Sequence, residues 1–356
     1  MRSSERANLP RWRGQAGFFE IWFAVVLDLG GDRAWWLRYT LFTPAPGAPG
    51  EPRATVWAAA FDCASDARPA VALKSIHPVT DFEASTTGRF GIRIGESELA
   101  PGRCHGRVDS GGHSIAWDLR SSPEDAVSVR REPRGTGLLP LPTHVHHSQD
   151  DVSFTGTVTV DGQRYDVRGA PGLQKHLWGR RRLEELTWLY CPRFQEDPEA
   201  RLEALTVLPR RSALSPRLTP IYLRTADARH TFHEVPGLLF SRMESPRPGE
   251  LHFRTATATA AMRGRAWCDP RTLVGYAYRD PEGWDVHVAQ SDVARCEVEL
   301  FTRPHPFAAW RQTGRLTSTV GALEFHAPEK LEHVRYLGWD DAALSEPTPR
   351  AMGDVG

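Results

Sequence analysis

The chain has 356 residues, enough for two domains of ordinary size, and its 40% hydrophobic and 25% charged residues are typical of a globular protein. The 44 basic and 44 acidic side chains balance, so no net field favours binding to nucleic acid or to an anionic membrane surface. No window approaches the roughly 18 consecutive apolar residues of a membrane-spanning helix, so no membrane span is expected.

The N-terminal residues and the cysteines indicate a cytoplasmic protein. Basic residues open the chain without a following apolar region, so no signal peptide is predicted. The five cysteines are scattered, and no two of them have the Cys-x-x-Cys spacing of a zinc or redox site. Reduced and mostly buried thiols are therefore expected.

Alternation of apolar and polar residues with a period of two dominates the chain, and this pattern is the signature of β-strands. Only 198–201 and 306–311 have the pattern of short helices. Many short antiparallel strands at regular spacing favour β-barrels or sandwiches. The strands predicted in chain order are 18–28, 34–43, 54–61, 90–94, 114–119, 152–160, 164–167, 186–190, 202–208, 221–225, 251–254, 272–278, 284–289, 295–301 and 316–325.

The first two predicted strands form a hairpin, and its second strand has one apolar and one mixed face. The mixed face carries Trp36 and Arg38 and is suited to line a cavity. Whether Glu20 and Trp22 of the first strand share that face depends on a single residue of register, which the turn does not determine. We therefore expect Trp22, Trp36 and Arg38 to contact a ligand.

Two positions are suited to a domain boundary. The segment 131–144 is rich in proline and glycine, as a linker would be. Alternatively, the hairpin predicted over 152–167 closes the first barrel and places the boundary near 169–172. The later position is favoured, because the glycine-rich segment that follows would then be the hinge. The expected domains are residues 15–170 and 171–340.

Several enzyme classes have no support in the sequence. The chain has no Gly-x-Ser-x-Gly elbow, no Walker loop, no Gly-x-Gly-x-x-Gly after a strand and no His-Glu-x-x-His. Hydrolase, nucleotide-dependent and zinc-protease chemistry is therefore not indicated.

A histidine-rich run at 144–147, followed by Asp150 and Asp151, most resembles a metal site. On an extended strand His144 and His146 would share one face, and a nearby carboxylate would complete a three-ligand set. Nothing else in the segment supplies the closed geometry of a zinc site. We interpret the run as a solvent-facing linker without a bound ion.

The most informative segment is 172–179, which places a lysine, a histidine and a tryptophan between glycines. The chain has only three lysines against 41 arginines, so Lys175 beside His176 is unusual for this composition. A histidine titrates near working pH, which suits His176 to act as proton donor or base. The segment therefore predicts a pocket, although it does not name a reaction.

Aromatic residues surround this histidine in the sequence. Trp178 follows it by two residues, and Trp188 and Tyr190 lie on the next predicted strand. Such a box would stabilise a cationic intermediate by roughly 0.5–2 kcal/mol per ring. The alternative is that the tryptophans are core between two barrels and that His176 only binds a backbone carbonyl.

Glu203 is a second candidate acid. It shares one face of its predicted strand with Arg201 and Leu205. If that face lines an apolar lumen, burial would raise the pKa of the carboxyl group and allow it to deliver a proton at neutral pH. If the face is exposed, Glu203 is an ordinary surface charge.

The chain resembles the two-domain lipocalin-like superfamily that contains carotenoid 1,2-hydratases, tocopherol cyclases, kievitone hydratase and several fungal Diels–Alderases. The resemblance implies two antiparallel lipocalin-like β-barrels packed side by side, a hydrophobic substrate at or near their interface, and no organic cofactor. It rests on Gly-Phe-Phe-Glu-Ile-Trp-Phe at 17–23 before Trp-Trp-Leu-Arg-Tyr at 35–39, His-Leu-Trp-Gly at 176–179, and Trp-Leu-Tyr at 188–190.

The resemblance extends to individual residues only in part. The His-x-Trp of the carotenoid hydratases matches His176 and Trp178. Their catalytic aspartate on a following strand has no aspartate counterpart in this chain, and Glu203 is the nearest acid. The absence of this aspartate argues against carotenoid hydration itself, whereas a related cyclisation stays compatible with the sequence.

Two hypotheses follow. The first is a cofactor-independent hydratase or cyclase acting on a hydrophobic polyene, isoprenoid or polyketide, in which His176 or Glu203 protonates a double bond; a pericyclic variant would need only shape control. The second is a lipocalin-type carrier that binds a small apolar ligand without changing it. The residues expected to bind substrate are Trp22, Trp36, Arg38, Lys175, Trp178, Trp188 and Tyr190.

Overall fold

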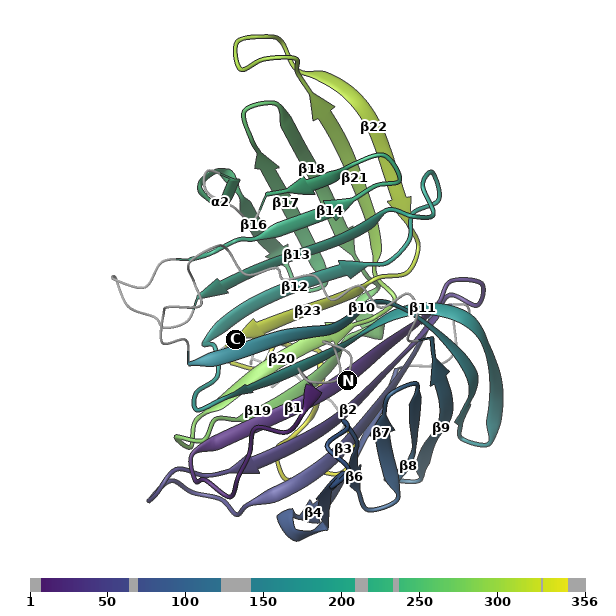
Figure 1. Ribbon diagram of the computed structural model, residues 1–356, viewed down its shortest axis with the longest axis vertical. Helices are drawn as coiled ribbons and strands as arrows, with labels where there is room; N and C mark the ends of the chain where they lie inside the picture. Colours follow the sequence, from purple (N-terminus) through teal and green to yellow (C-terminus); the bar gives the residue numbers. More distant parts are fainter. Residues whose placement is uncertain are drawn as a thin grey trace, which may run out of the picture.

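The computed structural model describes residues 8–63, 70–122, 142–208, 217–232, 237–327 and 329–344, which form three β-sheets (Figure 1). Neighbouring strands are antiparallel except for β19 (Val274–Arg279) and β24 (Arg335–Leu337), which pair in parallel. No helix of the described residues is long and apolar enough to cross a membrane. The predicted all-β antiparallel fold is confirmed.

One sheet contains all eleven strands of the N-terminal half, in the order β4-β3-β2-β1-β11-β10-β9-β8-β7-β6-β5. Its long strands twist, so the sheet curls into a nearly closed barrel in which the edge strand β4 approaches β8. The strands are β1 (Phe18–Asp28), β2 (Arg33–Thr43), β3 (Arg53–Asp62), β4 (Val71–Pro78), β5 (Phe82–Ala84), β6 (Ile92–Ile94), β7 (Ser97–Ala100), β8 (Arg103–Ser110), β9 (His113–Ser121), β10 (Thr143–Val160) and β11 (Gln163–Gly179).

The C-terminal half contains two sheets. An eight-stranded sheet has the order β15-β14-β13-β12-β23-β20-β19-β24, and a five-stranded sheet has the order β16-β17-β18-β21-β22. The remaining strands are β12 (Glu185–Cys191), β13 (Arg201–Leu208), β14 (Ile221–Arg224), β15 (Arg229–Thr231), β16 (Arg242–Arg247), β17 (Glu250–Ala256), β18 (Ala260–Trp267), β20 (Asp285–Ser291), β21 (Arg295–Thr302), β22 (Arg311–Ser318) and β23 (Ala322–Ala327). The helical turns are η1 (Val79–Asp81), α2 (Gly237–Phe240) and η3 (Pro270–Thr272).

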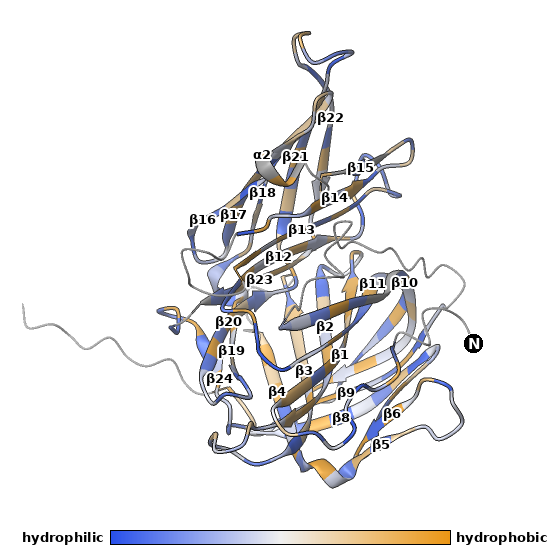
Figure 2. Cartoon of the chain, turned by 60° about the vertical axis from the view of Figure 1, so that its left-hand side comes forward, coloured by the Kyte–Doolittle hydropathy of each residue, from blue (hydrophilic) through white to orange (hydrophobic). Residues whose placement is uncertain are grey.

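Three clusters of buried apolar side chains form the core. The first fills the N-terminal barrel and includes Trp35, and the second lies between the two C-terminal sheets and includes Leu202. The third joins the N-terminal sheet to the eight-stranded sheet through Trp36, Trp57 and Tyr276. Trp35 and Trp36 enter different clusters because successive side chains of a strand point to opposite faces. Hydrophobic and hydrophilic residues are mixed along the strands (Figure 2).

An ion-pair cluster also crosses between the halves. Asp151 of β10 pairs with Arg201 of β13, and Arg224 of β14 lies 3.5 Å from the same carboxylate. Arg193 approaches its other oxygen at 3.8 Å. Several charges that share one half-buried carboxylate fix the position of β10 against the C-terminal sheet more firmly than an isolated surface pair would.

Three local predictions were wrong. The strand predicted over 316–325 is two strands in different sheets, β22 and β23, with Gly321 between them. A Cβ atom at Gly321 would lie 2.7 Å from Cys191 Sγ, so the chain passes too close to β12 for a side chain. The segments 198–201 and 306–311 form turns rather than helices, and β13 already begins at Arg201.

Both expected domain boundaries lie close to ordered strands. Residues 131–141 of the predicted linker 131–144 lie outside the described residues. Its last two residues already belong to β10, which begins at Thr143. The boundary predicted at 170/171 lies inside β11, which continues in the N-terminal sheet to Gly179. In the sheet topology, the change from the N-terminal sheet to the eight-stranded sheet falls between β11 and β12.

Candidate functional site

The register of β2, β1 and β11 divides the predicted site residues between the two faces of the N-terminal sheet. β1 lies between β2 and β11, so Trp22 stands opposite His176, and Phe23 stands opposite both Lys175 and Arg38. Residues opposite each other in a ladder project to the same face, and successive residues project to opposite faces. His176 and Trp22 therefore face the N-terminal barrel, whereas Lys175 and Arg38 face the eight-stranded sheet.

On the barrel side, His176 and Glu20 form a fully buried pair. His176 Nε2 lies 2.8 Å from Glu20 Oε1, and both side chains are 0% exposed. The ring of Trp22 stacks on the imidazole with centroids 4.8 Å apart, and the centroid of Trp178 lies 4.6 Å away. Because a carboxylate partner fixes the orientation and tautomer of a histidine, this is an oriented acid–base group held between aromatic rings.

Residues 8–12 close this pair from outside the strands. The backbone N–H groups of Arg11 and Trp12 donate to the two oxygens of Glu20, with N···O distances of 2.6 and 2.9 Å. Trp22 Nε1 donates to the carbonyl oxygen of Asn8 at 2.9 Å. The segment thus forms hydrogen bonds with the carboxylate and with the ring that stacks on His176.

On the interface side, Lys175 and Glu203 form a second buried pair. Lys175 Nζ donates to Glu203 Oε1, and Trp188 Nε1 donates to the same oxygen at 2.8 Å. The ammonium also lies 4.2 Å from the ring centroid of Trp188, which stacks on Tyr190 with centroids 6.1 Å apart. Tyr190 in turn donates its hydroxyl to the carbonyl oxygen of Gly172 at 3.1 Å. Glu203 therefore faces the inter-half interface, neither the barrel lumen nor solvent.

Arg38 lies in the same interface inside a cage of rings. Its guanidinium carbon is 4.0 Å from the ring centroid of Tyr278 and 5.6 and 5.5 Å from those of Trp36 and Trp57. Its Nε donates to Thr40 Oγ1 at 3.0 Å. The side chain is 3% exposed, and among the described residues no carboxylate forms an ion pair with it. The aromatic faces are therefore its main electrostatic partners.

Other buried ionisable groups have strongly perturbed pKa values, and Arg182 and Asp292 are two of them. Burial, followed by repulsion from Arg38, lowers the pKa of Arg182 to about 9. Burial raises the pKa of Asp292 to about 7, although a hydrogen bond of 2.8 Å from Gln290 Nε2 opposes the shift. Perturbed groups of this kind are enriched at functional sites, and they also occur in structural ion-pair networks.

The glycines of the 172–179 segment permit close packing. A Cβ atom at Gly172 would lie 2.0 Å from the carbonyl oxygen of Val25 in β1, and one at Gly179 would lie 2.3 Å from that of Pro142. Both glycines belong to β11, which continues through the segment within one sheet. The expected hinge between domains therefore stays a prediction, in a segment that the structure shows as continuous strand.

The histidine run at 144–147 is not a linker, because it lies in β10. His144 is exposed and its ring stacks on Trp178 with centroids 5.5 Å apart, and His146 stands opposite His176 in the β10–β11 ladder. The side chains of residues 147–150 lie outside the described residues. Among the side chains that are described, no group of three histidine, cysteine, aspartate or glutamate residues is arranged to hold a metal ion.

Comparison with known structures identifies the fold. Kievitone hydratase from Nectria haematococca superimposes with a TM-score of 0.51 at 9% identity, over 90% of this chain and 91% of that one. A protein assigned as AttH in Nitrosomonas europaea superimposes with a TM-score of 0.50 at 12% identity, over 90% of this chain and 99% of its own. The chain has the fold of kievitone hydratase. The resemblance inferred from the motifs is thereby confirmed at the level of the fold.

Sequence comparison adds relatives without a known activity. An uncharacterised protein present in two strains of Mycobacterium tuberculosis is 25% identical over 334 residues, which are 90% of this chain and 92% of the relative. No protein-family model matches the chain.

The structure brings the expected site residues together in two groups. The single aromatic box expected around the histidine does not form: Trp22 and Trp178 lie beside His176 in the barrel, whereas the other expected residues lie on the interface side. Glu20 was not among the predicted site residues. An acidic residue inside an otherwise apolar strand could have pointed to it. The residues on the interface side are Trp36, Arg38, Lys175, Trp188, Tyr190 and Glu203.

Proposed function

We propose that the chain is a cofactor-independent hydratase or cyclase that transfers a proton to a hydrophobic polyene, isoprenoid or polyketide at His176. The observation that carries the proposal is the His176–Glu20 pair, which is fully buried and lies against the rings of Trp22 and Trp178. A histidine held by a carboxylate is the usual arrangement of an oriented general acid or base.

In the proposed reaction, the imidazolium of His176 gives its proton to one carbon of a double bond, which leaves a carbocation on the other. The ring faces of Trp22 and Trp178 stabilise that cation by roughly 0.5–2 kcal/mol each. In a hydratase, water adds to the cation and its surplus proton returns to His176. In a cyclase, a second double bond of the same chain attacks, and loss of a proton restores the histidine.

Glu20 acts in this proposal as the positioning residue for His176. Its carboxylate keeps the imidazole in one orientation and fixes its tautomer. The backbone N–H groups of Arg11 and Trp12 saturate that carboxylate and exclude water from it. In this proposal residues 8–12 move to admit the substrate. When they return, they keep bulk water away from the carbocation, so that only the intended nucleophile reacts with it.

Glu203 is assigned no proton transfer in this proposal. It lies on the opposite side of the β1–β11 wall from His176 and already pairs with Lys175. The name of kievitone hydratase supports a hydration reaction as one use of this fold, but a shared fold does not by itself carry an activity to this chain.

The first step of the test is ligand capture. Native protein is extracted with organic solvent, and mass spectrometry identifies any apolar molecule that co-purifies. The captured molecule is then returned to ligand-free protein. We expect either a product heavier by one water molecule or an isomer of unchanged mass with a different retention time.

The second step compares matched histidine variants. His176→Ala should reduce turnover by about 10²–10⁴-fold while affinity stays within a few-fold, because a proton-transfer group is removed and the apolar wall remains. His113→Ala is the control, since His113 Nδ1 also lies 2.8 Å from a carboxylate oxygen, that of Asp161, but is exposed. Equal turnover by both variants and the wild type would exclude acid catalysis at His176.

A carrier that binds an apolar ligand unchanged is the second candidate. The ring-lined interface around Trp36, Trp57 and Tyr278 favours it, because holding a ligand needs apolar surface without an acid. Stoichiometric capture of a ligand that wild-type protein returns unaltered would favour this function over the enzyme.

A further inference from the structure

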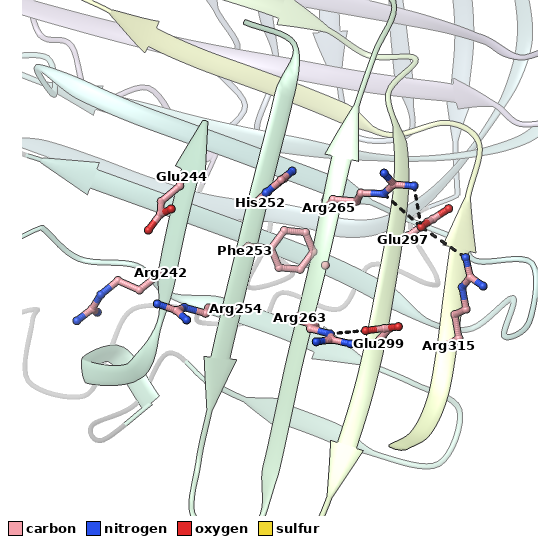
Figure 3. Close-up of a pocket in the computed structure, with 11 residues that line it drawn as sticks. Arg242, Glu244, His252, Phe253, Arg254, Arg263, Arg265, Glu297, Glu299 and Arg315 are labelled. Carbon is pink, nitrogen blue, oxygen red and sulfur yellow. Dashed lines mark hydrogen bonds and ion pairs between the residues drawn. The ribbon is translucent and has the colours of Figure 1, made fainter. Parts of the chain in front are cut away.

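A hollow of about 540 Å³ opens on the outer face of the five-stranded sheet, and none of the residues that line it belongs to the site described above (Figure 3). Its walls come from β16, β17, β18, β21 and β22, whose other face is the apolar core of the C-terminal half. Hollows of 300–1,000 Å³ are the usual size for small-molecule sites. Its lining holds five arginines and three glutamates, an excess of two positive charges in a chain that is neutral as a whole.

Three of these arginines form one row across neighbouring strands. Arg242 of β16 stands opposite Arg254 of β17, and Arg254 stands opposite Arg263 of β18. Figure 3 shows the three side chains following one another across the sheet. Like charges directly opposite in a ladder destabilise it, by roughly 0.2–1 kcal/mol per pair. The row is therefore not a feature that strand pairing alone would favour.

Two carboxylates on β21 form ion pairs with arginines of the hollow. Arg263 pairs with Glu299, and Glu297 accepts from both Arg265 and Arg315 at 3.3 and 3.5 Å. In the part of the chain that the structure describes, Arg254 makes no ion pair. The centre of the row thus presents a guanidinium without a carboxylate, flanked by two further arginines.

The geometry points to a binding site for a small phosphate-bearing molecule, with Arg254 at its centre. A guanidinium binds oxyanions through two parallel N–H donors, and the excess positive charge around Arg254 favours a phosphate group over a carboxylate, which carries less charge. The rest of the 540 Å³ hollow leaves room for an organic group beside the phosphate. This site is independent of the proposed reaction at His176.

The acidic residues limit the size of the anion. Glu244 lies on β16 at one end of the hollow, and Glu297 and Glu299 lie on β21, between Arg263 and Arg265 of β18 and Arg315 of β22. A long polyanion laid across the sheet would meet these carboxylates and be repelled, whereas a single phosphate group over Arg254 would not. A nucleic-acid strand is therefore excluded as the preferred ligand.

The test measures binding of inorganic phosphate by calorimetry, with sodium chloride keeping the ionic strength constant. Arg254→Ala should weaken phosphate binding by about tenfold or more, because charge-assisted hydrogen bonds are lost. Arg254→Lys keeps the charge but loses the two-donor geometry, so its affinity for phosphate should lie between those of the wild type and Arg254→Ala. Arg168→Ala, which removes an arginine 84% exposed on β11, should bind like the wild type.

Three outcomes would overturn the proposal. These are phosphate binding no stronger than that of chloride, equal binding of phosphate by the wild type and Arg254→Ala, and equal affinity for acetate and phosphate. Circular dichroism of each variant confirms that it is folded, so a loss of binding cannot reflect unfolding.

A second arm identifies the source of the phosphate. Vesicles of phosphatidylcholine and phosphatidic acid in equal parts are sedimented with the wild type and with Arg254→Ala. Sedimentation that depends on Arg254 supports the site and assigns the phosphate to a lipid headgroup. Phosphate binding that depends on Arg254 without sedimentation supports the site and assigns it to a soluble molecule.

Discussion

Trp22 and His176 stack nearly in parallel, with ring centroids 4.8 Å apart and planes 7° from each other, although 153 residues separate them along the chain. The contact exists because β1 and β11 are neighbours in the barrel and place the two residues opposite each other. It also places both rings beside Glu20, so the acid–base pair depends on strand register rather than on any local motif.

Glu20→Gln tests the buried pair. The amide keeps the shape of the carboxylate but cannot accept hydrogen bonds at both terminal atoms, as Glu20 does from Arg11, Trp12 and His176. We expect a loss of about 1–3 kcal/mol in the free energy of unfolding, measured by urea denaturation. Asp161→Asn, at the exposed pair with His113, should change it by less than about 0.5 kcal/mol. Equal effects of the two substitutions would contradict the structural role of the buried pair.

Removal of the N-terminal cover should expose the histidine. In the full chain His176 is 0% exposed, so diethyl pyrocarbonate should modify it slowly compared with the exposed His113. A chain shortened to begin at Arg13 lacks the residues that cover Glu20, and modification of His176 should become at least several-fold faster. Mass spectrometry of proteolytic fragments measures both rates in one sample. An unchanged rate at His176 would show that residues 8–12 do not control access.

The Lys175–Glu203 pair predicts strong coupling between its two members. Lys175→Met or Glu203→Gln leaves a buried partner without its counter-charge, which costs about 3–5 kcal/mol. The double variant removes both charges, so it should be more stable than the sum of the single effects predicts, by about 1.5–3 kcal/mol. Urea denaturation of all four proteins gives the coupling energy. Additive effects would mean that the two charges do not interact in solution.

Most of the fold was accessible from the sequence because its long strands are rich in aromatic and β-branched residues and end at turn residues. Residues 18–28 are bounded as the structure has them, and 34–43 differ from β2 by one residue. The failures have a common cause in tertiary contacts. The strand change near Gly321 is enforced by close approach to Cys191, and the early start of β10 by pairing with β11, neither of which the local pattern records.

The site was predicted less well for a related reason. The sequence groups Lys175, His176 and Trp178 by proximity, but pleating sends Lys175 to one face and the other two to the opposite face. The expected contact of His176 with Trp188 and Tyr190 was therefore wrong, while its contact with Trp178 was correct. The partner that matters most for the acid–base group, Glu20, lies 156 residues away, and only the register of β1 against β11 identifies it.

Asp292 makes stability depend on pH in a predictable direction. Burial raises its pKa from 3.8 to about 7, so between these values the folded state holds a proton that the unfolded state has released. The unfolded state then binds fewer protons than the folded state, and stability falls as pH rises from about 4 to about 7. Below about pH 4 the Asp292 carboxyl group is protonated in both the folded and the unfolded state, and above about pH 7 it is ionised in both. Its contribution to the free energy of unfolding therefore changes only between these pH values.

Asp292→Asn should remove this dependence, because the amide does not titrate and still accepts the hydrogen bond from Gln290. Its free energy of unfolding should match that of the wild type near pH 4 and exceed it at pH 8 by up to about 4 kcal/mol, since each unit of pKa shift is worth about 1.4 kcal/mol. Asp109→Asn is the control of opposite sign: a hydrogen bond from Arg107 lowers the pKa of Asp109, so this substitution should slightly reduce stability at pH 8. Urea denaturation of the wild type and both variants at pH 4 and pH 8 measures these differences in the free energy of unfolding. A constant difference between Asp292→Asn and the wild type across the range would show that Asp292 does not titrate there.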